Sequence, residues 1–302
     1  TTVSIGNGSP LSLKCLAFSA IGLDFLSNLL AMHNGGSMSV LYDRSPAVVI
    51  SAIETNLSNL WRSYSRLPNA ECYDQSDLFW VATSVPFPPF NGVLRTRVQP
   101  EMVTPTVTNT LQHFIHRDVP MLWVVSSTTQ PADLGSHLVD HGLTHLNDDP
   151  GMAIDLRVLP SSLPYPVGFT VEPVTDLATL SMWCGFTDQA EIAEALIAWG
   201  TTLGFAPNRP IVHFLGRLDG RPVATATLVL GGGVAGIYNV MTIPEAQRQG
   251  IGALMTVSPL MMARERGYKL GILQSSQMAY PLYRRLGFQD YCQFGIYLWS
   301  GK

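Results

Sequence analysis

Apolar residues gather in short runs over residues 168–299, and each run is bounded by glycine, proline or charged residues. These runs predict strands at 168–174, 211–218, 221–230, 233–243, 269–276 and 291–299. Apolar residues at helical spacing predict helices at 181–186, 191–205, 252–266 and 279–286. The predicted order is β-α-α-β-β-β-α-β-α-β, which describes a mixed α/β sheet.

Individual residues support several of these boundaries. Asp219-Gly220 is a dipeptide typical of a tight hairpin turn, so it predicts that the two flanking strands pair. Arg264, Arg266 and Gly267 are typical of a helix C-terminus, where cations and a glycine stabilise the last carbonyl groups. Gly287 closes the last predicted helix in the same way.

Part of the preceding sequence resembles this second half as a weak internal repeat. A helix at 106–117, a strand at 121–127 and a helix at 131–142 follow the same order and lengths as the helix, strand and helix that end at Gly287. Alignment on Gly142 and Gly287 places Leu138 where the second copy has Tyr283. The first copy also has no glycine ahead of its first helix, in RTRVQPEMVTPT, and has a few extra residues in its later loop. The first copy therefore keeps the order of elements of the second copy, and it has lost the glycines and the tyrosine that mark a site there.

Prolines and serines mark the expected domain boundary in RVLPSSLPYPVG, residues 157–168. We therefore predict a first domain of residues 1–158, here the first half, and a second domain of residues 159–302, the second half. The apolar stretch at 15–32 predicts an early helix of the first domain, because polar residues make it unsuitable for crossing a membrane. The prolines of 84–92 predict a rigid loop.

Composition narrows the class of partner. The chain has 302 residues, of which 13% are charged, and a net charge of −4. Nucleic-acid binding is excluded as an expectation, because phosphate backbones are bound by concentrated basic surfaces. Cys15, Cys72, Cys184 and Cys292 are widely spaced, which predicts reduced thiols rather than a zinc site or disulfides. We expect a soluble cytoplasmic protein.

The stretch PEAQRQGIGALM, residues 244–255, carries the chemistry of the second half. A strand, two glycines (Gly250 and Gly252) and a helix follow one another, so unpaired N–H groups are expected at the positive end of the helix. Such an arrangement binds anions, phosphates above all, and glycines let a pyrophosphate approach the backbone. Arg248 can add a charge-assisted contact.

Two other glycine-rich phosphate loops do not match. A P-loop needs Lys and Ser or Thr after its last glycine, whereas Ala253 and Leu254 follow Gly252. A dinucleotide fingerprint needs three glycines and a βαβ unit, whereas this loop has two glycines and follows a hairpin series.

The pattern resembles the GNAT superfamily of acyl-CoA N-acyltransferases. Its signature Q/R-x-x-G-x-G/A is met by Gln247, Arg248, Gln249, Gly250, Ile251 and Gly252. PLYRRLGF resembles the family's LYxxxGF segment, with Tyr283 at the position of its usual general acid. The resemblance covers about residues 168–299, and the first half resembles a degenerate copy, as in tandem members of the superfamily.

The resemblance implies two GNAT-like α/β domains in tandem, of which the second binds acetyl-CoA or another acyl-CoA. The expected cofactor-binding residues are Val240, Met241, Thr242, Gln247, Arg248, Gln249, Gly250, Ile251, Gly252, Ala253 and Ser276. Ser276 departs from the asparagine common in the family. A backbone N–H of the strand ending in 240–242 would face the developing oxyanion, and Tyr283 would protonate the leaving thiolate.

The expected reaction is direct transfer of an acetyl group to a primary amine of a small molecule, and a homodimer is a further option. The alternatives are a protein or peptide N-acetyltransferase and a non-catalytic acyl-CoA-binding protein. No general base is assigned, although Asp188, Glu191, Glu194, His213, Tyr238 and Asn239 border the expected acceptor side. His137 and His141 have a spacing that zinc sites use, but Gly142 ends their helix, so no metal is expected.

Overall fold

The structure, a computed structural model, describes residues 40–160 and 163–301. Every described residue belongs to one compact unit. The helix predicted at 15–32 and Cys15 therefore lie outside the described residues.

A long amphipathic helix opens the described part of the first half. The elements of this half are α2 (Pro46–Tyr64), β1 (Glu71–Asp74), β2 (Leu78–Ala82), η1 (Pro88–Phe90), β3 (Gly92–Thr96), η2 (Pro100–Met102), α3 (Val103–His116), β4 (Met121–Val125), α4 (Leu134–Asp140), β5 (Thr144–Asp155) and η3 (Leu156–Val158). The predicted helix–strand–helix series is confirmed as α3, β4 and α4. The helix α2 was not among the predicted elements, although Val49, Ile53 and Leu60 bury one face of it.

The second half follows the predicted order throughout. Its elements are β6 (Phe169–Pro173), α5 (Leu177–Cys184), α6 (Ala190–Leu203), β7 (Ile211–Leu218), β8 (Arg221–Gly231), β9 (Val234–Thr242), η4 (Pro244–Ala246), α7 (Ile251–Glu265), β10 (Leu270–Gln274), α8 (Tyr280–Leu286) and β11 (Gln289–Trp299). Asp219 and Gly220 have φ of +50° and +81°, as a tight hairpin turn between β7 and β8 requires.

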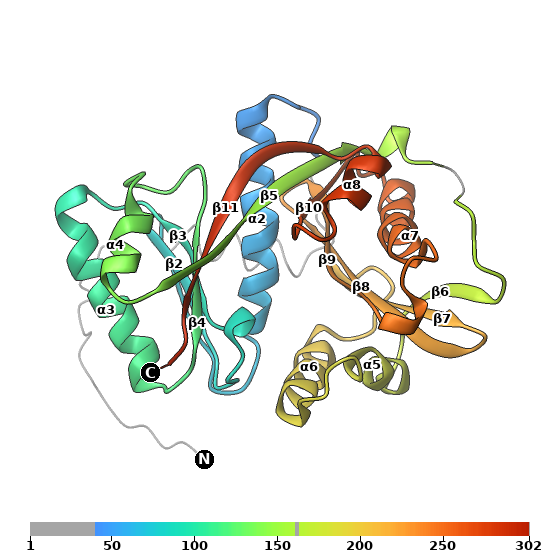
Figure 1. Ribbon diagram of the computed structural model, residues 1–302, viewed down its shortest axis with the longest axis horizontal. Coiled ribbons are helices and arrows are strands. Elements are labelled where there is room, and N and C mark those ends of the chain that lie inside the picture. The colour runs from blue at the N-terminus through green and yellow to red at the C-terminus, as the bar shows by residue number, and fades with distance from the viewer. Residues whose placement is uncertain (1–39, 161–162, 302) are drawn as a thin grey trace, which may run out of the picture. The chain divides into compact units, whose positions relative to one another are not determined.

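The described strands form one sheet in the order β1-β2-β3-β4-β11-β5-β10-β9-β8-β7-β6 (Figure 1). The two halves exchange their last strands in this sheet. β11 of the second half pairs with β4 of the first, from Gly295–Val125 to Trp299–Met121. β5 of the first half pairs with β10 of the second, from Leu270–Asp155 to Gln274–Gly151. The domain boundary between residues 158 and 159 stays a prediction, and a strand from each side of it completes the sheet of the other side.

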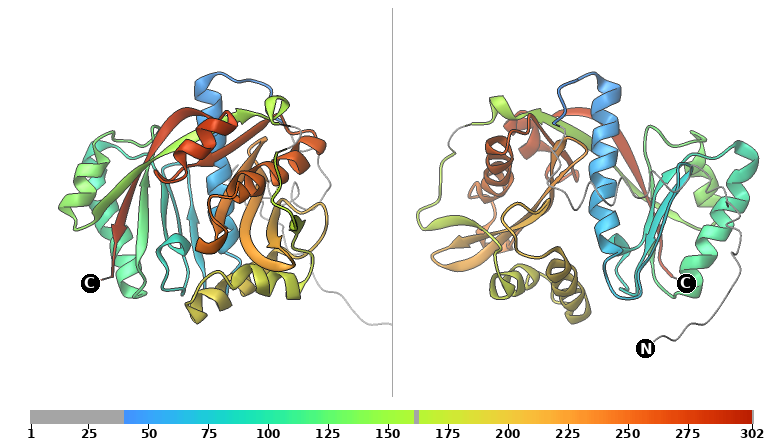
Figure 2. Two further views of the ribbon diagram at one scale, coloured as in Figure 1. Left: turned by 45° about the vertical axis from the view of Figure 1, so that its right-hand side comes forward. Right: turned by 180° about the vertical axis from the view of Figure 1, so that it is seen from behind.

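Helices cover both faces of the second-half sheet, because alternate side chains of a strand point to opposite faces. Val212 and Phe214 pack in the apolar cluster that contains α7 and α8. Ile211 and Leu215 pack in the cluster that contains α2, α5 and α6. Figure 2 shows α2 between the strands of the first half and the β8–β9 hairpin, and α2 contacts strands of both halves.

One side chain fixes α2 to this hairpin. Asn56 is fully buried, and its amide donates to the carbonyl oxygens of Val229 and Gly231 at 3.0 and 2.8 Å. Its carbonyl oxygen accepts a hydrogen bond from the Tyr238 hydroxyl at 2.8 Å. The first half is thereby held against the strand that leads into the candidate site.

Candidate active site

The strand β9 has an unpaired edge along most of its length. It pairs in parallel with β10 at only two positions, Ala235–Gly271 and Gly236–Ile272, while its other edge stays bonded to β8 as far as Thr242. Beyond Gly236, the edge of β9 that faces β10 therefore has no strand partner in the sheet. Val240, Met241 and Thr242, three of the predicted cofactor-binding residues, lie in this unpaired part.

A β-bulge changes the direction of β9 within the unpaired part. Thr227 pairs with Tyr238 and Thr225 pairs with Met241, so two residues of β9 oppose one residue of β8. Asn239 adopts the left-handed region, with φ of +52°. Two hydrogen bonds hold it there: its carbonyl accepts from the Thr225 hydroxyl at 3.0 Å, and its amide donates to the Thr227 hydroxyl oxygen at 3.2 Å.

The loop after β9 presents free amides to solvent. Arg248 and Gly250 have φ of +61° and +83°. Among the described residues, the N–H groups of Arg248, Gln249 and Gly250 donate to no backbone carbonyl, and the first amides of α7 have no partner within the helix. Successive free amides with alternating backbone conformation form an anion-binding concavity at the positive end of a helix.

The two glutamines of the motif brace this loop. The Gln247 side-chain amide donates to the carbonyl of Thr242 at 3.0 Å, which ties the loop to the end of β9. The Gln249 side-chain amide donates to the carbonyl of Glu245 at 3.3 Å. Their side chains thus hold the backbone of the loop, and the loop's own amides are left to bind an anion.

Tyr283 projects from α8 into the apolar cluster under α7. Its side chain is buried, and its ring lies edge-on to Phe288 with centroids 5.7 Å apart. Burial raises the pKa of the Tyr283 phenol, and the hydroxyl of Thr256 on α7 opposes this in part. The phenol is therefore protonated at neutral pH, as a proton donor must be.

The segment between β10 and α8 also carries Ser276. The exposed Ser276 accepts the Ala279 N–H through its hydroxyl at 3.4 Å, and its carbonyl accepts the N–H of Tyr280 at 3.0 Å. Ser276 thus forms the turn that starts α8. A Cβ atom on Gly252 would lie 3.3 Å from Leu282, so the motif helix and the Tyr283 helix pack closely.

The residues expected to border the acceptor side lie in different surroundings. Asp188 lines a cavity of about 520 Å³, together with neighbours from the α5–α6 segment, Arg221 and Ile243 just after β9. Glu191 and Glu194 are exposed on α6 and do not line it. His213 lies in the core, so sequence position alone placed these candidates too closely together.

The environment of His213 keeps it neutral. Its ring lies between those of Trp183 and Trp199, at centroid distances of 4.2 and 4.9 Å, and its Nδ1 is 3.0 Å from the Thr227 hydroxyl. Burial, aided by the charge of Arg209, lowers the pKa of His213 to about 3.

In the described part of the first half, residues 40–158, both parts of the site are missing. Its counterpart pair, β3 and β4, also meets at two positions only, Gly92–Leu122 and Val93–Trp123. Beyond them, the segment after β4 fills the gap: the Gln130 N–H donates to the Thr96 carbonyl at 2.9 Å, and the Val98 N–H donates to the Gln130 carbonyl at 3.1 Å. The extra loop residues noted in the sequence therefore occupy the strand edge that stays free in the second half.

The anion loop is also missing from the first half. The turn η2 ends at Met102 and α3 starts at the next residue, whereas four residues separate η4 from α7. Leu138, the counterpart of Tyr283, is fully buried on α4. Residues 40–158 therefore contain no counterpart of the free strand edge or of the loop of free amides.

The described residues contain no group of three or more His, Cys, Asp or Glu side chains that could hold a metal ion. His137 lies 3.8 Å from Asp133, and the ring of His141 bonds the carbonyl of His137 instead of facing a shared centre. Within the same described ranges, no helix combines the length and apolarity needed to cross a membrane.

Comparisons with known proteins agree with this geometry. Residues 210–290 match the family model of the acetyltransferase (GNAT) domain. No curated protein sequence matches the chain.

Solved structures match a larger part of the chain. A GCN5-related N-acetyltransferase from Kribbella flavida has a TM-score of 0.60 at 21% identity, covering 80% of this chain and 93% of its own. A tandem GNAT protein from the clavulanic acid biosynthesis pathway has a TM-score of 0.54 at 12% identity, covering 84% and 95%. A GCN5-related N-acetyltransferase from Sphaerobacter thermophilus has a TM-score of 0.54 at 17% identity, covering 77% and 76%.

At these identities, the similarity shows a shared fold, and it confirms the predicted mixed α/β architecture. The family match falls on the strands and helices that form the unpaired β9 edge, the free-amide loop and α8. Residues 210–290 therefore match a GNAT acetyltransferase domain, and the chain shares its fold with GNAT proteins, including a tandem one.

Proposed function

We propose that the second half transfers an acetyl group from acetyl-CoA to a primary amine of a small molecule. The observation that carries this proposal is the continuity of the unpaired β9 edge with the loop of free amides at the start of α7. Such a path offers backbone groups to an extended amide-containing arm and then N–H groups to a pyrophosphate, which is the order of these parts in coenzyme A.

The residues of the loop fit an anionic group. The amides of 248–250 have no backbone acceptor among the described residues, and a Cβ on Gly250 would meet nothing within 4 Å. Arg248 is exposed beside them and can add its guanidinium. Acetyl-CoA supplies a thioester that is activated toward attack by an amine.

Two groups of this chain would assist the transfer. A backbone N–H of residues 240–242 on the unpaired edge would stabilise negative charge on the carbonyl oxygen, a contact whose loss costs roughly 3–4 kcal/mol in other enzymes. Tyr283, protonated because burial raises its pKa, would donate a proton to the leaving sulfur.

The acceptor would enter from the side of Asp188. The cavity of about 520 Å³ beside Ile243 is large enough for a small molecule and is lined by one carboxylate, Asp188, and one guanidinium group, Arg221. The net charge of −4 and the scarcity of lysine also favour a cationic acceptor, such as an amino sugar or an amino acid derivative.

Two alternatives predict different outcomes. A protein N-acetyltransferase would prefer peptides with free N-termini over small amines. A non-catalytic binding protein would bind acetyl-CoA and release no thiol with any amine. A screen of amino sugars, amino acid derivatives and peptides, read out as thiol release from acetyl-CoA, separates all three.

The Tyr283→Phe variant tests the proposed proton donor. We expect a fall in kcat of about 10²-fold with little change in KM for acetyl-CoA, because the hydroxyl would act on the leaving group and not on cofactor binding. Tyr280→Phe is the matched control, since Tyr280 lies on the same helix and its hydroxyl bonds Asp290 at 2.8 Å. Equal rates for the two variants would remove Tyr283 from the mechanism.

A further inference from the structure

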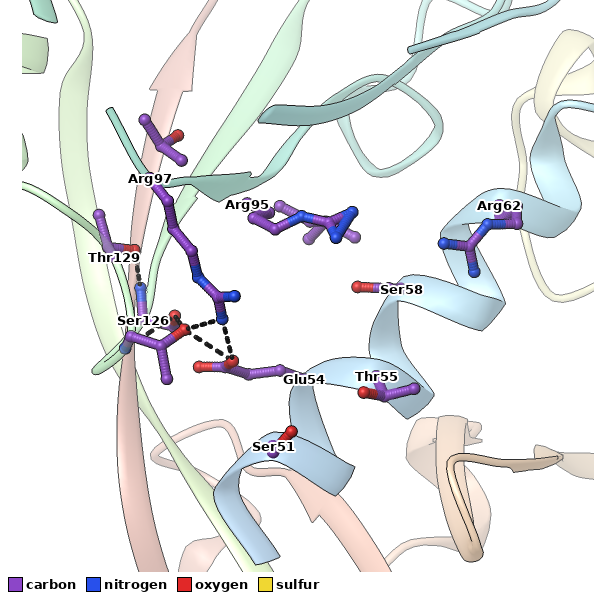
Figure 3. Close-up of a pocket in the computed structure, with 12 residues that line it drawn as sticks. Ser51, Glu54, Thr55, Ser58, Arg62, Arg95, Arg97, Ser126 and Thr129 are labelled. Carbon is purple, nitrogen blue, oxygen red and sulfur yellow. Dashed lines mark hydrogen bonds and ion pairs between the residues drawn. The ribbon is translucent and has the colours of Figure 1, made fainter. Parts of the chain in front are cut away.

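The first half contains a polar cavity of about 180 Å³ that the proposed transfer does not use (Figure 3). Its walls come from α2, from the end of β3 with the residue after it, and from residues 126–129. None of these residues belongs to the unpaired β9 edge, the free-amide loop or α8. The segment after β4 that fills the strand edge through Gln130 also supplies part of this wall.

Hydroxyl groups and charges dominate the lining. Seven serine and threonine residues surround three arginines, Arg62, Arg95 and Arg97, and one carboxylate, Glu54. A cavity formed only by packing defects would have apolar walls, because burying polar groups without partners costs free energy. The lining is therefore suited to a polar ligand.

Glu54 and Arg97 form an incomplete charge pair at one side of the cavity. Their nearest oxygen and nitrogen lie 3.7 Å apart, which exceeds hydrogen-bond distance. The Thr128 hydroxyl lies between them, donating to Glu54 at 2.7 Å and accepting from Arg97 at 2.9 Å. The other Glu54 oxygen, Oε1, has no hydrogen-bond partner within the described residues. The Glu54 carboxylate can thus accept a further hydrogen bond, and the Arg97 guanidinium can donate further ones.

On the other side of the cavity, Arg62 and Arg95 are held in place by neighbouring groups, and the cavity as a whole carries excess positive charge. Arg62 and Arg95 share one carboxylate, Asp74, and both guanidinium groups lie over the Phe79 ring, at 5.1 and 5.6 Å. Figure 3 shows the guanidinium groups of Arg62 and Arg95 directed toward each other. Asp74 and Glu54 together neutralise two of the three arginines, and Nε of Arg95 has no partner in the part of the chain described.

We propose that this cavity binds a small, free, polar α-amino acid. Its carboxylate would contact Arg97 and Arg95, which point to the same face of β3, and its ammonium group would contact Glu54. An anion alone would leave the Glu54 carboxylate without a further partner, and a cation alone would be repelled by the excess positive charge of the arginines. A zwitterion matches both, because it separates its two charges over a short distance.

Size and surroundings agree with such a ligand. The cavity of about 180 Å³ has room for a small amino acid such as serine or threonine. The seven hydroxyl side chains can bond a polar side chain of the ligand. The first half of the chain would then have replaced an acyl-CoA site by an amino-acid site.

Calorimetry at low ionic strength, with acetyl-CoA absent, tests the proposal on the whole chain. The probes are L-serine, L-threonine and L-asparagine, together with lactate, which lacks the amine, and ethanolamine, which lacks the carboxylate. We expect one site for at least one amino acid, and binding at least tenfold weaker for lactate and ethanolamine. No amino-acid binding at millimolar concentrations, or equal binding of lactate, would overturn the proposal.

Variants locate the site. Arg97→Gln and Glu54→Gln should each weaken amino-acid binding at least tenfold, while Glu191→Gln, which removes an exposed carboxylate on α6, should leave it unchanged. Retained acetyl-CoA binding shows that a variant is folded. Unchanged affinity in both cavity variants contradicts the assignment. If a variant fails to fold, the comparison of the probes on the unmodified chain serves as the test.

Discussion

At Gly250 the backbone has φ of +83°, a region that costs a residue with a side chain roughly 1–2 kcal/mol. At Gly252 the backbone is helical, and the reason for glycine is the close approach of Leu282 on α8. The motif therefore contains one glycine that shapes the free-amide loop and one that brings the Tyr283 helix near. Arg248 also adopts positive φ, without being a glycine, so its neighbours must hold it there.

His213 gives a residue-scale prediction about pH. Its pKa is lowered from 6.5 to about 3 in the folded chain, so the unfolded chain binds a proton at higher pH. The stability that neutral His213 contributes is complete above pH 6.5 and is lost as the pH falls toward 3. Between pH 7 and pH 5, we expect it to account for about 2 kcal/mol of the fall in unfolding free energy.

Urea unfolding of a His213→Gln variant at both pH values measures this contribution. On going from pH 7 to pH 5, the unfolding free energy of the variant should fall by about 2 kcal/mol less than that of the unmodified chain. His137→Gln, at a half-exposed position, is the control. Identical pH dependence in all three proteins would contradict a neutral buried His213.

At the scale of elements, the second half could be predicted from sequence because its boundaries have strong local signals, such as Asp219-Gly220 and Gly287. The helix α2 also has a local signal, because Val49, Ile53 and Leu60 stand at helical spacing. The bulge at Asn239 has no local signal, since it depends on Thr225 and Thr227 of the neighbouring strand. The sequence showed the extra residues before Gln130 but not their place at the strand edge.

The contact between α2 and the β8–β9 hairpin gives an element-scale prediction. Asn56→Ala removes the donor to three backbone carbonyls, of Val229, Gly231 and Val234, and leaves the Tyr238 hydroxyl without its acceptor. Because these groups are buried, we expect a loss of about 2–4 kcal/mol in unfolding free energy.

Asn59→Ala is the matched control for this variant, since Asn59 lies one turn away on α2 and is half-buried. Its loss should stay below about 1 kcal/mol. Equal losses in denaturant unfolding would mean that α2 is not held by Asn56.

At the scale of the whole molecule, the exchange of β5 and β11 joins the two halves. β4 at Met121–Val125 depends on β11 for its outer hydrogen bonds, and β10 depends on β5. Sequence could not show this, because each half simply ends in a strand, and nothing in that strand identifies its neighbour. We therefore expect the two halves to unfold as one cooperative unit, in spite of the predicted linker near residue 158.

Hydrogen exchange in increasing urea tests this coupling. Amides of β4 in the first half and of β10 in the second half should become exposed at the same urea midpoint, because neither strand keeps its neighbours when the other half opens. Two well-separated midpoints would show that the halves unfold independently in spite of the exchanged strands.

We propose one acyl-CoA site, in the second half, with the amides beside Gly250 holding the cofactor. Calorimetric titration with acetyl-CoA tests it most directly, on the unmodified chain and on Gly250→Glu, which adds a carboxylate and a Cβ at a positive φ. We expect micromolar binding at one site per chain, lost in the variant because the new charge repels the pyrophosphate and the loop is strained. Two sites per chain, unchanged binding in the variant, or no binding of acetyl-CoA and longer acyl-CoA would contradict it.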